Sequence, residues 1–267
     1  MGDRMKVHLR VRRIGGRTLR VLTLRPGTDV RFSANHFHST WHVVSSFQGG
    51  RLLAHLLWGL AFQRKPGTLF VLHGPHLSPT PFDADPSPPI VLVPRRLTGF
   101  DATLGKALRH ALPTLGPPDC TVRWQSHGLG RAVAAPTPPR WEIARDERAR
   151  SLGGCVCLDG SPEALRKLAI HVADMRTGRE GRSDYLPFAE HGRTWFPDGE
   201  VQLFDEYDRM VSVAREARRR VVDRPAEASS TGCPQDALRM RVWREVPVVL
   251  EKRGWKDLRE RARPPSG

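Results

Sequence analysis

Residues 154–172, GCVCLDGSPEALRKLAIHV, carry the clearest folding signal in the chain. The apolar run at 154–158 has the length of a buried strand, and Ser161-Pro162-Glu163 follows it closely. Serine can accept hydrogen bonds from the first helical N–H groups, proline suits the first turn, and glutamate is favourable at the positive end of the helix dipole. Helical spacing is then kept by four apolar residues, Leu165, Leu168, Ala169 and Val172. This stretch predicts a strand that leads into a capped helix.

Two further elements are expected downstream of this helix. Residues 200–204, EVQLF, alternate polar and apolar side chains as a half-buried strand does. A following amphipathic helix is indicated by an apolar stripe of Tyr207, Met210, Ala214, Ala217 and Val221. Residues 151–223 therefore predict a small β-α-β-α arrangement.

The first half of the chain has a different mixture of elements. Residues 6–13 and 17–24 alternate apolar and basic side chains around Gly15-Gly16, which is typical of a two-residue hairpin turn. Residues 51–64 predict a helix with almost no polar face, which should be buried. The other expected elements are strands at 41–47, 68–73, 90–93 and 121–125 and a helix at 101–112.

These elements predict an α/β fold of the mixed α+β type. We expect a mixed-sheet domain at residues 1–135 and a Pro-rich linker at 136–150. A smaller β-α-β-α domain at 151–223 and a flexible link with a basic tail at 224–267 complete the predicted organisation.

The chain is strongly basic. It has 43 Lys and Arg against 28 Asp and Glu, a net charge of +15, and a pI near 10.9. Only six of the basic residues are lysine, so part of the excess is typical of a GC-rich genome. Basic residues concentrate in 1–31 and 237–263, whereas acidic residues outnumber basic ones in 159–208. Separate basic and acidic surfaces are expected, which favours a macromolecular partner, either a protein or a nucleic acid.

Several classes of protein are disfavoured by what the sequence lacks. Its longest nearly apolar run, residues 52–62, is far shorter than the roughly 20 residues of a membrane span, and the first residues have no secretory core. Its four cysteines have no disulfide-framework spacing. Glycine-rich phosphate loops and a nucleophile elbow are missing. We expect a cytoplasmic protein that contacts no membrane and needs no cofactor.

A histidine cluster is the sharpest candidate site for chemistry. His36, His38 and His42 would share one face of a single extended strand, where they could hold zinc and leave a position open for water. His73 and His76 could complete the site of a metal-dependent hydrolase that acts on a phosphodiester or a nucleic acid. Because no Asp or Glu occurs between Asp29 and Asp83, any carboxylate must come from a distant part of the chain. The alternative is a half-exposed strand with histidines on its polar face.

Two weaker patterns also involve groups that could take part in chemistry. The tripeptides His38-Ser39-Thr40 and His76-Leu77-Ser78 are similar to the paired motifs of two-histidine phosphoesterases. Cys155 and Cys157 would point to the same side of a strand, and could bind zinc together with histidines. For the two cysteines, burial among apolar side chains is the favoured interpretation.

Part of the second half resembles a known family. The segments CLDGSPEALRKLA at 157–169, DYLPFAEH at 184–191 and GEVQLF at 199–204 resemble immunity modules that partner polymorphic bacterial toxins. The resemblance covers about residues 153–204. It implies a β-α-β domain without catalytic activity that binds a protein, and it assigns no functional residue.

The sequence thus predicts a non-catalytic intracellular binding protein that docks a macromolecular partner, and the family resemblance implies an immunity-like form. The first alternative is the histidine-cluster hydrolase. The second is an Arg-rich nucleic-acid-binding protein that uses the basic ends of the chain.

Overall fold

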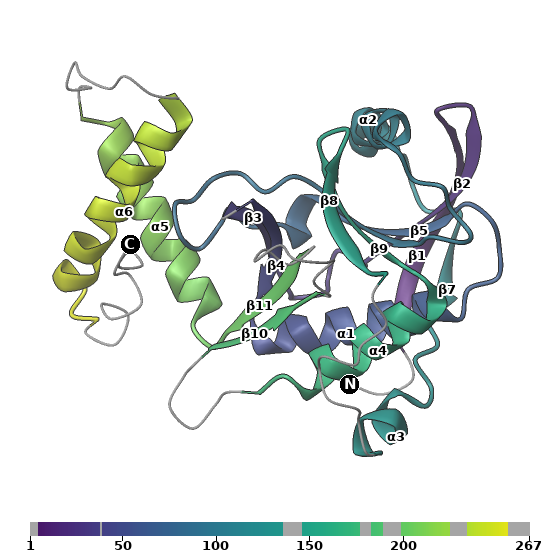
Figure 1. Cartoon of the computed structure of the whole chain (residues 1–267). Helices are drawn as coiled ribbons and strands as arrows, with labels where there is room; N and C mark the ends of the chain where they lie inside the picture. The colour runs from purple at the N-terminus through teal and green to yellow at the C-terminus, as the bar shows by residue number, and fades with distance from the viewer. Residues whose placement is uncertain are drawn as a thin grey trace. The chain divides into compact units, whose positions relative to one another are not determined.

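In the computed structural model of the chain (Figure 1), the described residues are 5–37, 39–135, 146–176, 183–188, 199–224 and 234–255. The chain divides into two compact units. One comprises Met1–Leu77 and Pro88–Asp205, and the other comprises Ser78–Ser87 and Glu206–Gly267. The predicted mixed α/β class is confirmed, because two mixed sheets and several helices are present.

A seven-stranded sheet forms the centre of the first unit, with the strand order β7-β1-β2-β5-β6-β9-β8. The Gly15-Gly16 hairpin turn is present, and both glycines have positive φ, 57° and 77°. β6 and β9 are parallel neighbours, whereas β8 and β9 form an antiparallel pair. The strands are β1 (Lys6–Ile14), β2 (Arg17–Thr23), β5 (Thr68–Leu72), β6 (Ile90–Pro94), β7 (Cys120–Arg123), β8 (Arg148–Leu152) and β9 (Cys155–Gly160).

Helices cover both faces of this sheet (Figure 1). α2 (Ala102–Ala111) packs on one face, over an apolar layer that includes Val71, Val91 and both cysteines of β9. The opposite face packs against α1 (Phe47–Ala61) and α4 (Pro162–Asp174), which lie against each other. As predicted, α1 is buried along most of its surface, because its leucines face apolar neighbours. α4 begins with the expected cap, since Ser161 Oγ accepts a hydrogen bond from the N–H of Ala164.

A second sheet in the same unit has four strands in the order β10-β11-β4-β3. β3 (Phe32–Phe37) was not expected as a separate strand, because the sequence predicted one extended strand through His36, His38 and His42. It forms an antiparallel hairpin with β4 (Thr40–Ser45). β11 (Glu200–Phe204) lies parallel to β4 and antiparallel to β10 (Ser183–Pro187).

The division into units differs from the predicted second domain at 151–223. β9 pairs with β6 inside the large sheet, and β11 pairs with β4, so both strands belong to the first unit. Of the linker predicted at 136–150, residues 136–145 lie outside the described part, and β8 begins at Arg148. Sheet pairing between distant segments therefore sets the boundary.

The second unit contains α5 (Tyr207–Val222), α6 (Pro234–Lys252) and the loop at 78–87. Much of the predicted basic tail is therefore helical, and α6 packs its apolar residues against α5. Asp85 in the loop is held by two arginines, with Arg218 Nη1 and Arg239 Nε each 2.6 Å from its carboxylate. The described helices include none that is long and apolar enough to cross a membrane.

The ion pairs of Asp85 make the second unit sensitive to acid. Burial alone would raise the pKa of this carboxyl, but the hydrogen bonds and charges of Arg239 and Arg218 outweigh it and hold the pKa below its usual 3.8. The carboxylate therefore stabilises the fold above its unfolded-state pKa of 3.8, and this contribution is lost as the pH falls through the lower folded-state value. We expect Asp85→Asn to cost about 2 kcal/mol of unfolding free energy at pH 7.

Urea unfolding at a series of pH values checks this expectation. The difference in unfolding free energy between wild type and Asp85→Asn should be constant from pH 7 to pH 5 and should become smaller as the pH falls towards 2. A difference of the same size at pH 7 and at pH 2 would show that the charge of Asp85 is not involved.

Candidate functional site

The histidines predicted for a metal site do not lie on one continuous strand. β3 and β4 pair as an antiparallel hairpin, so that His36 pairs with Trp41 and His42 pairs with Asn35. Paired residues of an antiparallel hairpin share a face, and neighbouring positions alternate. His36 and His42 therefore lie on opposite faces, which corrects the expectation that one extended strand would align them. His38 is outside the described residues.

The surroundings of these two histidines differ as well. His36 is exposed, with its ring 4.8 Å from that of Trp41, measured between centroids. His42 is buried, and its Nε2 lies 3.5 Å from Glu200 Oε2, so a distant segment does supply a carboxylate. Burial raises the pKa of Glu200, while a hydrogen bond from Gln202 lowers it. The contact connects β4 to β11, which are parallel neighbours.

His73 and His76 lie at a short 3-10 turn (Gly74–His76). Burial lowers the pKa of His73, and the charges of Arg10 and His76 lower it further. His76 is buried and contacts backbone groups of residues 25–30, and burial is the main cause of its lowered pKa. In the described part of the chain, no group of three or more His, Cys, Asp or Glu side chains is placed to hold a metal ion.

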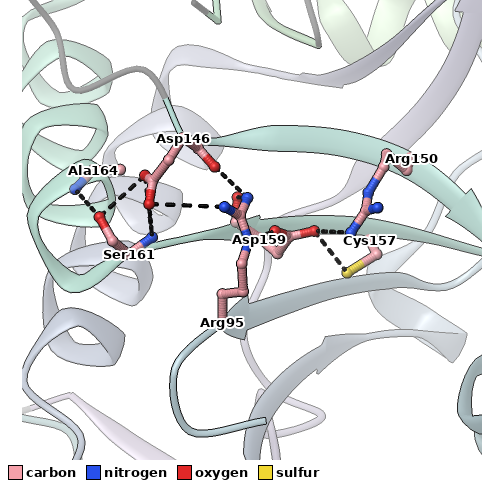
Figure 2. Close-up of polar contacts among 7 residues, drawn as sticks. All are labelled: Arg95, Asp146, Arg150, Cys157, Asp159, Ser161 and Ala164. Atoms are coloured by element: carbon pink, nitrogen blue, oxygen red, sulfur yellow. Dashed lines mark hydrogen bonds and ion pairs between the residues drawn. The ribbon is translucent and has the colours of Figure 1, made fainter. Parts of the chain in front are cut away.

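A network of charged side chains occupies the edge of the large sheet where the parallel strands β6 and β9 end. Figure 2 shows the Asp159 carboxylate between two guanidinium groups, those of Arg95 and Arg150. The Arg150 Nη2 atom is 2.8 Å from Asp159 Oδ2, and Arg95 also contacts Asp146. Asp146 accepts hydrogen bonds from the N–H and the hydroxyl of Ser161, 3.0–3.2 Å away.

This edge is where α/β sheets commonly bind ligands. Here the carboxylates are already bonded to arginines or to the start of α4, so the network joins β6, β8, β9 and α4 to one another. Its geometry explains why these elements meet.

Burial disfavours the thiolate form of the two cysteines of β9. Burial raises the pKa of Cys155 to about 11, and it raises the pKa of Cys157 well above the usual value. The interpretation of these cysteines as buried apolar side chains is confirmed, since both lie in the apolar layer under α2.

Alkylation should separate these thiols from Cys120, which is exposed. In a Cys233→Ser variant at pH 8, we expect iodoacetamide to modify Cys120 rapidly, because the thiolate is the nucleophile and the buried thiols stay protonated. Cys155 and Cys157 should react only after unfolding, as followed by mass spectrometry. Equal rates at Cys120 and Cys155 in the native protein would contradict this expectation.

A pocket of about 730 Å³ lies beside α1 in the first unit. It is formed by α1, the segment after β7, α3 (Leu129–Ala134) and one residue of α4. Gln48, Arg51 and His55 recur at i, i+3 and i+7, so they form one stripe along α1. This stripe is the polar side of a helix that is otherwise almost wholly buried.

Tryptophan side chains fix the opposite wall of the pocket to α1. Trp124 Nε1 donates a hydrogen bond to the His55 carbonyl, and Trp58 Nε1 donates to the His127 carbonyl, each at 2.9 Å. A Cβ added to Gly59 would lie 2.4 Å from the Trp124 indole, so this close packing requires glycine. The His55 Nδ1 and Ser126 Oγ atoms are 2.7 Å apart at the pocket. The wall is therefore held by several specific contacts.

The pocket is cationic. Arg51 and Arg131 line it with exposed side chains, and neither makes a side-chain hydrogen bond or ion pair with any other residue that the structure describes. Its described lining includes two histidines, Ser126 and Gln48, and no Asp or Glu. By contrast, the guanidinium groups of Arg95, Arg218 and Arg239 are bonded to carboxylates. The pocket arginines are thus available to an anion.

Sequence reasoning did not select these pocket residues. The polar stripe at Gln48, Arg51 and His55 is visible in an otherwise apolar helix and could have been noticed. The partner segment at 126–131 could not, because it is reached only through the β7 pairing and the tryptophan contacts. No family model, curated protein or solved structure matches the chain.

Proposed function

We propose that the protein is a non-catalytic binding protein that docks an anionic macromolecule, with nucleic acid as the partner class. The observation that carries this proposal is the pocket beside α1, in which Arg51 and Arg131 are the charged groups of the described lining. The net charge of +15 supports it, because a basic surface attracts a polyanion and releases its counterions. A cytoplasmic location is part of the same proposal.

Salt-dependent binding tests this function. The probe is a short, fluorescently labelled single-stranded oligonucleotide with a 5′-phosphate, and anisotropy is measured between about 50 and 200 mM salt. We expect affinity to fall steeply with salt, and Arg51→Ala and Arg131→Ala each to lower the slope of log K against log salt by about 0.7. Affinity that does not change with salt would overturn the proposal.

A matched control is provided by Arg13→Ala. Arg13 is exposed on β1, it is not part of the pocket lining, and its removal changes the net charge by the same amount. If Arg51 contacts the nucleic acid, Arg13→Ala should lower the slope of log K against log salt by less than Arg51→Ala does. Equal effects would show that only the overall charge matters.

A second candidate, hydrolysis of an anionic ester, is favoured by the His55–Ser126 contact. A serine hydroxyl that is hydrogen-bonded to an imidazole is the arrangement of an activated nucleophile. If Ser126 acts in this way, a fluorophosphonate will label it in the native protein and Ser126→Ala will lose the label. The metal-dependent form of the hydrolase has less support, since His36 and His42 lie on opposite faces.

The resemblance to immunity modules supports a protein partner instead of a nucleic acid. Its strand and capped helix correspond to β9 and α4. β9 is an internal strand of the large sheet, so a protein partner would contact the outer side of α4. Absence of binding to any oligonucleotide in the assay above would favour this alternative.

A further inference from the structure

The pocket beside α1 has a buried floor and a charged rim. Ser126 and Leu129 line it with almost no exposure, 2% and 3%, whereas Arg51 and Arg131 are exposed. The pocket therefore combines two exposed guanidinium groups with a nearly buried hydroxyl. The end of a chain reaches such a nearly buried group more easily than does the middle of a strand that continues in both directions.

The charges at the pocket match that of a phosphate monoester. A terminal phosphate has three acceptor oxygens and a charge of about −1.5 to −2 at pH 7. Guanidinium groups bind phosphate oxygens through paired N–H donors, and two of them match nearly two negative charges. The Gln48 amide is a further donor on the same stripe of α1, and it makes no hydrogen bond with another described side chain.

Ser126 adds a donor at the floor. Its Oγ lies 2.7 Å from His55 Nδ1, and either atom can donate, depending on the imidazole tautomer. When the proton is on Nδ1, the ring donates to Oγ and the hydroxyl hydrogen can turn towards a bound oxygen. A backbone phosphodiester, with one negative charge and two free oxygens, would leave part of this donor set unused.

We infer that the pocket recognises a terminal phosphate at the end of a nucleic acid strand, with Arg51 and Arg131 on its oxygens. This inference rests on the proposed function, because it names the part of the nucleic acid that enters the pocket. The rest of the strand leaves past the rim and contributes contacts that do not depend on the terminal group.

Oligonucleotides of one sequence that differ only at the ends test the inference. Anisotropy is measured with a 5′-phosphate, a 3′-phosphate or hydroxyls at both ends. Wild type should bind at least one phosphorylated probe about tenfold more tightly than the hydroxyl probe, as expected for charge-assisted hydrogen bonds. Arg51→Ala and Arg131→Ala should remove this preference, and Arg13→Ala should retain it. Circular dichroism confirms that each variant is folded.

The outcomes distinguish the two proposals. Salt-dependent binding of all probes with equal affinity would overturn the terminal-phosphate inference and leave the docking function in place. Loss of the preference in Arg13→Ala to the same degree as in Arg51→Ala would also overturn it. No binding of any probe would contradict both. Gln48→Glu offers an independent check, because a carboxylate at the pocket should repel the phosphate and weaken binding of the phosphorylated probe only.

Discussion

Replacing Asp159 with asparagine is expected to lower the free energy of unfolding by about 2–3 kcal/mol. The Asp159 side chain is only 3% exposed and contacts both Arg95 and Arg150. Removing one partner of a buried ion pair usually costs about 3–5 kcal/mol, because the remaining charge stays unpaired. Since these arginines are 35% and 44% exposed, water compensates part of the loss, and we expect the lower figure.

Urea unfolding measures this change, and Asp174→Asn is its control. Asp174 also contacts an arginine, Arg176, but the two side chains are 53% and 79% exposed. An exposed ion pair contributes little to stability, so the unfolding free energy of Asp174→Asn should differ from that of wild type by less than about 0.5 kcal/mol. If Asp159→Asn were as stable as Asp174→Asn, the network would not hold the edge of the sheet together.

The second large change in the free energy of unfolding is expected from Gly105→Ala in α2. An added Cβ would lie 2.2 Å from the Leu152 carbonyl oxygen, where the backbone of α2 meets the turn between β8 and β9. Helix propensity alone would make alanine more favourable by about 1 kcal/mol. Because the close atom belongs to the backbone, the helix must move away, and we expect a net loss of about 2 kcal/mol.

Gly130→Ala in α3 serves as the matched substitution. A Cβ at this position meets no heavy atom within 4 Å, so the gain in helix propensity should remain, up to about 1 kcal/mol. Thermal and urea unfolding of both variants show whether each substitution raises or lowers the free energy of unfolding. A stabilised Gly105→Ala variant would contradict the close approach between α2 and the turn.

Local signals account for the parts of the fold that could be predicted. The Gly15-Gly16 turn and the Ser161 cap act within a few residues, so their strands and helix were expected in the correct places. β3 was missed because FSANHF has no clear alternation, and its pairing with β4 depends on a turn in which Ser39 has a φ of 61°.

Long-range pairing accounts for what could not be predicted. Residues 148–150 were assigned to a linker, and they belong to strand β8 because Arg150 reaches Asp159 and β8 pairs with β9. The pocket also depends on a long-range contact, since His55 and Ser126 are 71 residues apart in the chain. Residues of a helix stripe can be chosen from their spacing, but their partners across the fold cannot.

The second unit combines two segments that are far apart in the chain, and this has a consequence for protein synthesis. Asp85 is 133 residues from Arg218 and 154 residues from Arg239, so it leaves the ribosome long before either arginine. At typical translation rates of about 5–20 residues per second, this interval is on the order of ten seconds or more. Throughout that time the Asp85 carboxylate lacks both of these arginine partners, and its two ion pairs can be complete only when α6 has been translated.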